Sequence, residues 1–342
     1  MSQLVDHLAA LTEFRDRDLL DATLVSAFRD LLQPLSVAIY RCVGDPGNQR
    51  WLARARLGAN DVVATADPAW SDIDSLPRMA DHPERYEAYS RGRAVVLAGP
   101  VHLGVFPVTT EGDGVGVLEI RTEAPLDDAA QRLIRSVLRI YGNFQALLDY
   151  SERDTLTGLL NRKTFDNSFL KATAEAGTAA PGGAHERRAE SPLGAYWVGV
   201  IDIDHFKRVN DNCGHLIGDE VLLLLARLMR SGFRIHDRLY RFGGEEFVVL
   251  MRCESESCAA LAFERFRSCT EKYPFPQIGQ ITISIGFTEV MPGDTPSGAF
   301  ERADKAVYYA KGHGRNQVCS HAALIASGEL IDASKVGDVE LF

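Results

Sequence analysis

The sequence predicts an α+β fold in two domains that are joined by a long helix. A length of 342 residues exceeds one ordinary domain and allows two, each able to bury its own core. Strand-like runs separated by turns dominate residues 1–126, whereas strand and helix patterns follow one another in the order βαββαβ over residues 195–310. Between these regions, a helical pattern with a broad apolar face covers residues 127–153.

Residues 1–126 are expected to form an antiparallel sheet with accompanying helices. The helical patterns cover residues 4–11 and 19–32, and the strand-like runs cover residues 36–42, 51–57, 94–97, 101–108 and 115–121. The stretch before the third run is rich in Asp, Pro and Ala and is expected to be irregular. This arrangement resembles a GAF sensor domain, although no motif in it specifies a ligand. His102 is expected to be a packing or surface residue rather than a ligand.

The linking segment predicts a helix with a heptad seam. Apolar residues recur at alternating spacings of four and three, and further apolar residues broaden the stripe. The seam comprises Leu133, Val137, Ile140, Phe144 and Leu147, and the broadening residues are Ile134, Leu138, Tyr141 and Leu148. Two interpretations remain open, because such a face can pair with a second copy of the chain or pack entirely on the first domain.

The region after residue 194 predicts a ferredoxin-like palm. Its elements are a strand at 195–203, a helix at 216–230, a hairpin at 238–251, a helix at 257–271, a strand at 281–287 and a helix at 298–310. The βαββαβ order is the one that this fold requires. A short strand is expected after residue 316. Residues 172–192 are expected to be a mobile surface loop, and residues 321–342 an acidic tail with no assigned role.

The run from Arg241 to Leu250 carries the most chemistry. Gly243 and Gly244 separate two β-forming stretches, which predicts a hairpin with a two-residue turn at positive φ. Glu245 and Glu246 follow directly, beside backbone that no side chain blocks. Glycines allow a ligand to approach the main chain, and carboxylates bind Mg²⁺, the usual partner of a nucleoside triphosphate. Taken alone, the run is more typical of an ordinary Gly-Gly hairpin with a solvated acidic strand start than of a nucleotide site.

A second acidic motif ends the strand at 195–203. Asp202 and Asp204 are expected on one face of this strand, by its period of two. If the strand lies beside the hairpin, Asp202 and the two glutamates can share metal ions, and Lys207 supplies a counter-charge for phosphate. Asp204 has an alternative role, which is to cap the segment that follows.

Residues 154–320 resemble a GGDEF domain, the catalytic domain of diguanylate cyclases, with the signature in its Gly-Gly-Glu-Glu-Phe form. The resemblance rests on an ordered series of motifs that covers about half of the chain. They are residues 154–162, 202–211, 214–220, 241–250, 284–286 and 303–316.

The resemblance implies a metal site for Mg²⁺, with Mn²⁺ as an alternative. Its ligands would be Asp202, the carbonyl of Ile203 and Glu245, with Glu246 beside them. Adjacent side chains on an extended strand diverge, so the residues alone leave open which glutamate binds metal and which is the general base. The resemblance favours Glu245 for the metal and Glu246 for catalysis.

The resemblance also implies how GTP is bound. Asn210 and Asp219 would read the guanine edge, because an amide offers a donor and an acceptor and a carboxylate accepts guanine N–H groups. Asp219 also suits the first turn of a helix, and the two roles are compatible. The phosphates would meet Phe206, Lys207, Gly243, Gly244, Lys311 and Arg315.

The implied reaction condenses two GTP into cyclic di-GMP and two pyrophosphates. Since each domain binds one GTP, the enzyme would work as a homodimer through the linking helix and the sensor domain. Arg234 and Asp237, five residues before the signature, resemble the family's product-inhibition site. Arg265 is the expected third contact, with Arg267 as the alternative placement. Competing hypotheses are a silent receptor or scaffold for cyclic di-GMP, and an enzyme that cyclises a single nucleotide.

Composition narrows the class of protein. A net charge of −10 argues against a nucleic-acid polymer or an acidic membrane surface as partner. No apolar run is long enough to span a bilayer, and the N-terminal residues lack a signal-peptide pattern. The six cysteines show no metal-ligand spacing. Reduced thiols in a cytoplasmic protein are therefore expected.

Overall fold

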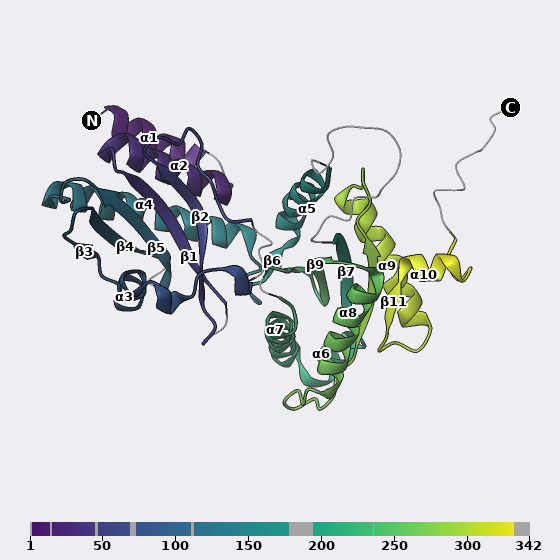
Figure 1. Cartoon of the computed structure of the whole chain (residues 1–342). Coiled ribbons are helices and arrows are strands. Elements are labelled where there is room, and N and C mark those ends of the chain that lie inside the picture. The colour runs from purple at the N-terminus through teal and green to yellow at the C-terminus, as the bar shows by residue number, and fades with distance from the viewer. Residues whose placement is uncertain are drawn as a thin grey trace, which may run out of the picture. The chain divides into compact units, whose positions relative to one another are not determined.

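The computed structural model describes residues 2–13, 16–44, 47–68, 73–110, 113–177, 194–234 and 236–331. The chain divides into two compact units, Met1–Ser151 and Glu152–Phe342, which are coloured from purple to teal and from teal to yellow in Figure 1. No helix in the described ranges combines the length and the apolar character that crossing a membrane requires.

The first unit is built on a five-stranded antiparallel sheet in the order β2-β1-β5-β4-β3. Its strands are β1 (Ser36–Val43), β2 (Arg50–Gly58), β3 (Val95–Leu97), β4 (His102–Thr110) and β5 (Asp113–Thr122). Its helices are α1 (Ser2–Glu13), α2 (Arg17–Leu32), α3 (Pro83–Arg91) and α4 (Asp128–Glu152), with short 3₁₀ turns at η1 (Ile73–Ser75) and η2 (Met79–Asp81). Every strand expected from the sequence is present within this unit.

The prediction of an irregular stretch between β2 and β3 is wrong for residues 83–91, which form α3. Pro83 occupies the first turn of this helix, and Gly92 ends it in the left-handed conformation with φ 61°. Proline at the start and glycine after the end are ordinary helix boundaries. The signal was therefore present in the sequence, but the helix is short and largely polar.

The sheet of the first unit separates two apolar cores. On one side α1, α2 and α4 pack on strand residues such as Ile39 and Leu118. On the other side α3 and the η2 segment pack on Trp51 and Val117. Figure 1 shows α1 and α2 on one side of this sheet and α3 on the other. The alternation of Val117 and Leu118 between the two cores follows the period of a strand.

Helix α4 is anchored on its own unit through one face. Tyr141 is 1% exposed and donates a hydrogen bond to buried Asp21, and Gln145 Nε2 donates to the Tyr141 hydroxyl at 2.6 Å. The predicted seam is split: Val137 is 2% exposed, whereas Ile140 is 36% and Leu147 65% exposed. Part of the apolar stripe thus belongs to the core, and pairing through the remainder stays a prediction.

The second unit has a six-stranded sheet in the order β11-β10-β7-β9-β8-β6. Its strands are β6 (Leu160–Asn161), β7 (Ala195–Ile203), β8 (Arg238–Gly243), β9 (Glu246–Cys253), β10 (Ile283–Glu289) and β11 (Val318–Ser320). Its helices are α5 (Arg162–Gly177), α6 (Phe206–Cys213), α7 (His215–Gly232), α8 (Glu256–Lys272), α9 (Pro296–Gly312) and α10 (His321–Ala326). The central strands β10, β7, β9 and β8 are antiparallel and follow the predicted βαββαβ order.

Two predictions about the second unit need correction. Residues 172–177 belong to α5 rather than to a loop, and Ala172 is 4% exposed. The remainder of that predicted loop, residues 178–192, lies outside the described residues. Residues 321–326 form α10 rather than a tail, because Leu324 packs with Ala306 and Ala310 of α9. The end of the predicted tail, residues 332–342, also lies outside the described ranges.

Helices cover both faces of the second sheet. On one face α7 and α8 form the main core with Trp197, Ile201 and Ile203 of β7. On the other face α9 lies so close to β10 that a Cβ at Gly286 would be 2.1 Å from the Ala303 carbonyl oxygen. Glycine is required there by close approach. The position of Asp202 on the α9 side of β7 is what forms the site.

Candidate active site

Asp202 is delivered by the central strand β7, where it lies opposite Glu246 of β9 and Ser284 of β10. The residue is 5% exposed. Its Oδ2 lies 2.7 Å from Lys311 Nζ at the end of α9, and its Oδ1 has no hydrogen-bond partner among the described residues. Burial raises the pKa of Asp202, and the Lys311 ammonium opposes that rise.

The signature turn lies one residue later than the Gly-Gly pair suggests. Gly243 pairs with Glu246 after a register shift in β8, so the two connecting residues are Gly244 and Glu245. Gly243 has φ 143° and Gly244 has φ 53°, conformations that glycine adopts readily. A Cβ at either glycine would meet nothing within 4 Å. The glycines therefore serve backbone conformation and leave open space above the turn.

Glu245 and Glu246 both lie in the electric field of Asp202. Burial is the main cause that raises the pKa of each, followed by the negative charge of Asp202, while Lys311 opposes the rise in both cases. Glu245 occupies the turn and Glu246 begins the strand, so the two are not neighbours within one extended strand. The opposite orientation expected for such neighbours therefore does not prevent both side chains from lying near Asp202. These three carboxylates and Lys311 form the candidate active site.

The donor set fits a divalent cation. In the described part of the chain, no three His, Cys, Asp or Glu side chains are arranged so that they could hold a metal ion together. Lys311 supplies the positive charge at Asp202 instead. The buried, unpartnered Oδ1 of Asp202 is costly to leave without a counter-ion, and carboxylate oxygens are the ligands that Mg²⁺ prefers.

Two further charged residues that the sequence did not single out face Glu246. Asp304 of α9 raises the pKa of Glu246 and Arg162 of α5 lowers it, both by charge and both less than burial and Asp202 do. Arg162 also lies over the ring of Phe242, 5.4 Å from its centroid. Both residues fall within the motifs that carry the resemblance, and only tertiary proximity identifies them as neighbours of the site.

Arg241 holds the signature turn in place. Its Nε and Nη2 donate hydrogen bonds to the Gly244 carbonyl at 3.2 and 2.9 Å, and its Nη1 donates to Asp154 Oδ1 at 3.0 Å. Burial alone would raise the pKa of Asp154, but hydrogen bonds from Thr157 and Arg241 lower it overall. Arg241 thus ties the turn of residues 154–158 to the signature turn, a positioning role that sequence analysis missed.

Asp204 joins elements of the sheet rather than capping α6. Its two carboxylate oxygens accept hydrogen bonds from Thr282 Oγ1 and Ser284 Oγ, each at 2.7 Å, and from the Asn316 backbone N–H at 3.0 Å. The N-cap position of α6 is His205, which makes no side-chain cap. Asp204 therefore fixes the chain after α9 against β10, which in turn places the residues around Arg315.

The two predicted guanine-reading residues lie on adjacent helices. Asn210 is half-buried on α6, and Asp219 is exposed in the first turns of α7. Gly218 lies between them, and a Cβ there would be 2.0 Å from Asn210 Oδ1. The absence of a side chain at Gly218 is thus what allows the Asn210 amide to occupy its place. Sequence analysis did not assign Gly218 this role.

The predicted phosphate-binding residues differ in how exposed they are and in what they contact. Phe206 is 5% exposed and anchors α6, so its backbone rather than its ring is available, and Lys207 is exposed beside it. Arg315 is exposed, with φ 62° and a backbone hydrogen bond to the Ala310 carbonyl at 3.0 Å. Lys311 is engaged with Asp202. A triphosphate must therefore compete with Asp202 for the Lys311 ammonium.

Arg234, Asp237 and Arg265 line a separate pocket of about 570 Å³ with residues of β9 and α8. The Asp237 side chain is 5% exposed. Its Oδ2 accepts a hydrogen bond from the Arg234 backbone N–H at 2.8 Å. Its Oδ1 has no hydrogen-bond partner in the described part of the chain and lies 3.9 Å from His236 Nε2. Burial raises the pKa of Asp237 to about 6, although Arg234 and Arg265 oppose the rise.

The structure distinguishes the two arginines considered as the third contact. Arg265 lines this pocket and donates a hydrogen bond to the Gly232 carbonyl at 2.8 Å. Arg267 points elsewhere, to Glu264, Glu271 and Asn316. Of the two, Arg265 alone lies among the residues that line the pocket.

Residues 151–317 match the protein family described as "Diguanylate cyclase, GGDEF domain". The chain is similar to diguanylate cyclase DgcP of Pseudomonas aeruginosa, at 38% identity over 168 residues, 48% of this chain and 23% of that protein. It is also similar to a diguanylate cyclase of Vibrio cholerae, at 30% identity over 276 residues, 78% of this chain and 77% of that protein. The solved GGDEF domain of DgcB from Caulobacter crescentus, in complex with c-di-GMP, is 34% identical and covers 50% of this chain and 96% of its own, with a TM-score of 0.44.

The relatives differ in how much of their length this chain spans. It spans 23% of DgcP and 57% of diguanylate cyclase DgcZ of Escherichia coli, each less than two thirds. The match to the Vibrio cholerae protein, by contrast, covers 77% of that protein. At 276 residues, it is longer than the matched GGDEF region of residues 151–317. The chain belongs to the GGDEF family of diguanylate cyclases.

Proposed function

We propose that the protein condenses two GTP molecules into cyclic di-GMP. The observation that carries this proposal is the buried Asp202. Its Oδ1 has no hydrogen-bond partner among the described residues, and its negative charge acts on Glu245 and Glu246 at the glycine turn. In the reaction the 3′-oxygen of each GTP bonds to the α-phosphorus of the other. The bond from that phosphorus to the β-phosphate oxygen breaks, and two pyrophosphates leave.

Asp202, the Ile203 carbonyl and Glu245 would hold Mg²⁺ or Mn²⁺, with Glu246 beside them. When bound, the ion supplies polarisation of the α-phosphoryl group and acidification of the attacking hydroxyl. Following the family resemblance, we assign the 3′-hydroxyl proton to Glu246 and the ion to Glu245. Clean removal of the carboxylate charge at residue 246 should therefore abolish turnover.

The remaining residues bind and orient the nucleotide. At the guanine edge, the Asn210 amide would donate and accept hydrogen bonds, and the Asp219 carboxylate would accept them. Lys207, Lys311 and Arg315 would neutralise the phosphates, with the glycine backbone of the signature turn approaching them closely. Positioning of this kind supplies much of the rate enhancement in phosphoryl transfer.

Catalysis would require two such domains facing each other in a homodimer, because one domain binds one GTP. The exposed Ile140 and Leu147 of α4 support pairing of this helix with its counterpart. The first unit would act as a GAF-like sensor that sets how often the two catalytic domains meet. Mutation of the exposed seam should then lower activity without altering the residues of the site.

Cyclic di-GMP would inhibit its own synthesis at the pocket of Arg234, Asp237 and Arg265. Asp237 Oδ1 is buried and makes no hydrogen bond within the described residues, so it offers an acceptor for guanine N–H groups. The two arginines offer donors for guanine and phosphate oxygens. A pocket of about 570 Å³ accommodates a nucleotide base with part of its phosphate.

The proposal is tested by GTP turnover of the purified chain with Mg²⁺, with the products separated by chromatography. Glu246→Gln should abolish product, whereas Glu301→Gln, an equivalent change on the exposed face of α9, should leave the rate unchanged. Chelation of the metal should stop the reaction, and Mn²⁺ should restore it. Cyclic GMP as the product would show single-nucleotide cyclisation, and cyclic di-GMP binding without turnover would favour a silent receptor.

A further inference from the structure

The first unit contains a pocket of about 750 Å³ that the proposed cyclase chemistry does not use. Its walls are the start of β2, the residues just before it, and the segment through η2 into α3. The lining residues are Gly47, Asn48, Gln49, Arg50, Arg78, Met79, Ala80, Pro83 and Tyr86. Small-molecule sites in proteins usually measure roughly 300–1,000 Å³, so this pocket has room for a ligand of metabolite size.

One side of the pocket carries two arginines. The Arg50 side chain is 8% exposed, and its contact with the largely exposed Asp74 is long, at 3.4 Å. The Arg50 Nε has no hydrogen-bond partner among the described residues. Arg78 is exposed and makes no ion pair within the described part of the chain. None of the nine lining residues is acidic, and the long contact of Arg50 with Asp74, which is not a lining residue, leaves positive charge facing the pocket.

The arginine pair is held by backbone hydrogen bonds. Residues 50 and 78 form an antiparallel bridge. The Trp51 N–H donates to the Pro77 carbonyl at 3.0 Å, and the Met79 N–H donates to the Gln49 carbonyl at 3.2 Å. Met79 is 6% exposed and packs with Trp51 in the core beneath α3. The two guanidinium groups are therefore attached to a fixed wall, which lowers the entropy cost of ordering them around a ligand.

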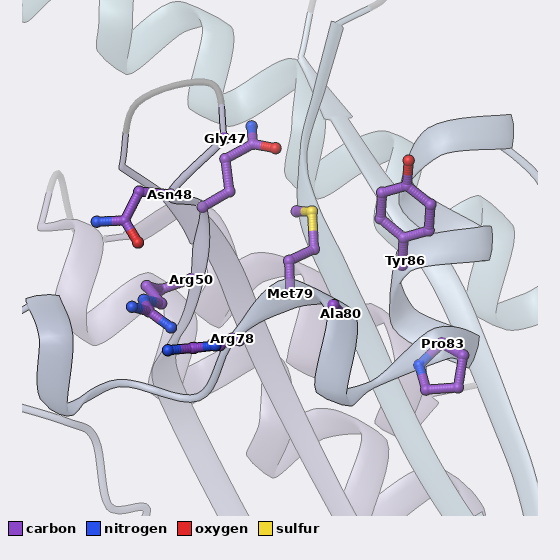
Figure 2. A pocket seen from close by; sticks show the side chains of 9 residues that line it. Gly47, Asn48, Arg50, Arg78, Met79, Ala80, Pro83 and Tyr86 are labelled. Carbon is purple, nitrogen blue, oxygen red and sulfur yellow. The ribbon is translucent and has the colours of Figure 1, made fainter.

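The opposite side of the pocket is apolar. Figure 2 shows Arg50 and Arg78 on one side, Met79 in the middle, and Pro83 and Tyr86 on the other side. Tyr86 is 51% exposed, and an aromatic ring at the rim of a pocket commonly covers the flat face of a ligand. Positive charge on one side and apolar surface on the other favour a ligand with an anionic group at one end and an apolar body at the other.

We propose that this pocket is a binding site for a small organic anion. A carboxylate or phosphate group of the ligand would pair with Arg50 and Arg78, since guanidinium groups bind both kinds of oxyanion in a bidentate manner. Its apolar or aromatic body would lie over Met79, Pro83 and Tyr86. Binding would supply the hydrogen-bond partner that the buried Arg50 Nε lacks.

Methyl NMR of the full chain tests the site directly. The chain has five methionines; Met79 lines this pocket, and Met251 lines the pocket of Arg234 and Asp237. With ¹³C-methyl methionine, the Met79 signal is identified by its loss in Met79→Leu. Phenylacetate and phenyl phosphate serve as anionic probes, and 2-phenylethanol serves as a neutral probe of similar shape.

Titration of either anion through the millimolar range should shift the Met79 signal saturably and leave the Met251 signal in place. The probe that binds more tightly distinguishes a carboxylate ligand from a phosphate ligand. Arg78→Gln, a change at an exposed position that spares the core, should weaken binding about tenfold, because it removes one charge-assisted pair. Arg93→Gln, an equally exposed arginine of the same unit outside the pocket, should have no effect.

Three results would overturn the proposal. They are a Met79 signal that no anionic probe shifts, equal shifts with 2-phenylethanol and phenylacetate, and unchanged affinity in Arg78→Gln. This measurement does not depend on cyclase activity, so it tests the binding site independently of the proposed reaction.

Discussion

Gly218→Ala should weaken GTP recognition without weakening the fold. A Cβ at residue 218 would lie 2.0 Å from Asn210 Oδ1, whereas ordinary van der Waals contact begins at 3.4 Å. The amide oxygen would have to retreat by the difference, about 1.4 Å. Hydrogen bonds to oxygen tolerate only roughly 0.5 Å of variation in length, so a guanine contact made by Asn210 would be lost.

The size of the effect follows from the loss of one buried hydrogen bond. Such a loss costs about 1–2 kcal/mol, or roughly 5- to 30-fold in kcat/KM. Glycine to alanine within a helix otherwise gains about 0.5–1 kcal/mol, and the clash is with the end of a side chain, so the melting temperature should hold or rise. The assay is steady-state turnover of GTP, with thermal unfolding measured on the same sample.

A double-mutant cycle isolates the cause. If Gly218→Ala acts through Asn210, it should change kcat/KM in the wild-type background and have no further effect in Asn210→Ala. Fully additive effects, or a KM that Gly218→Ala leaves unchanged, would refute the assignment of Gly218 as a positioning residue for Asn210.

Three further predictions concern the signature turn, the packing of α9 and the product site. Arg241→Lys should lower kcat about tenfold at saturating GTP with little change in melting temperature, because lysine cannot bridge two turns with a planar fork; an unchanged kcat would contradict this. Gly286→Ala should lower the free energy of unfolding by about 1–3 kcal/mol in urea titrations, because α9 must move away from β10. Ionised Asp237 is the form that accepts guanine N–H groups, and its pKa is raised to about 6. Inhibition by cyclic di-GMP should therefore weaken as pH falls below that value, and Asp237→Asn should lack inhibition at every pH. The same raised pKa links folding to pH. The contribution of Asp237 to the free energy of unfolding is complete below its ordinary pKa of 3.8 and is lost as pH rises through about 6. Asp237→Asn should thus gain stability relative to wild type above about pH 6.

Much of the fold could be predicted from local patterns. Strand β7 has the predicted bounds, Ala195–Ile203, because an uninterrupted apolar run that ends in polar residues specifies a buried strand. The helices α3 and α5 were missed for different reasons. α3 is short and polar, whereas α5 carries Phe165, Phe169 and Ala172 at helical spacing but precedes a low-complexity stretch that obscured its end.

The site was predicted less completely than the fold, because several of its features depend on tertiary contacts. The register shift that moves the turn to Gly244 and Glu245 has no local signature. The contact between the Lys311 ammonium and Asp202 joins the end of α9 to β7, two elements more than a hundred residues apart in the chain, so no local pattern reveals it. Arg265 and Arg267 are two residues apart, so they point to nearly opposite sides of α8, and only packing decides which of them faces the pocket.

The position of Asp202 is fixed by packing on the other face of its strand. Asp202 has one polar partner in the described structure, Lys311. Three residues earlier, Gly199 faces α8, where a Cβ would lie 2.2 Å from the Phe263 ring. A larger residue at 199 would be excluded from that position, and a slip of one residue would exchange the two faces of β7. The contact between Gly199 and Phe263 therefore holds the register that keeps Asp202 on the α9 side, opposite Glu246.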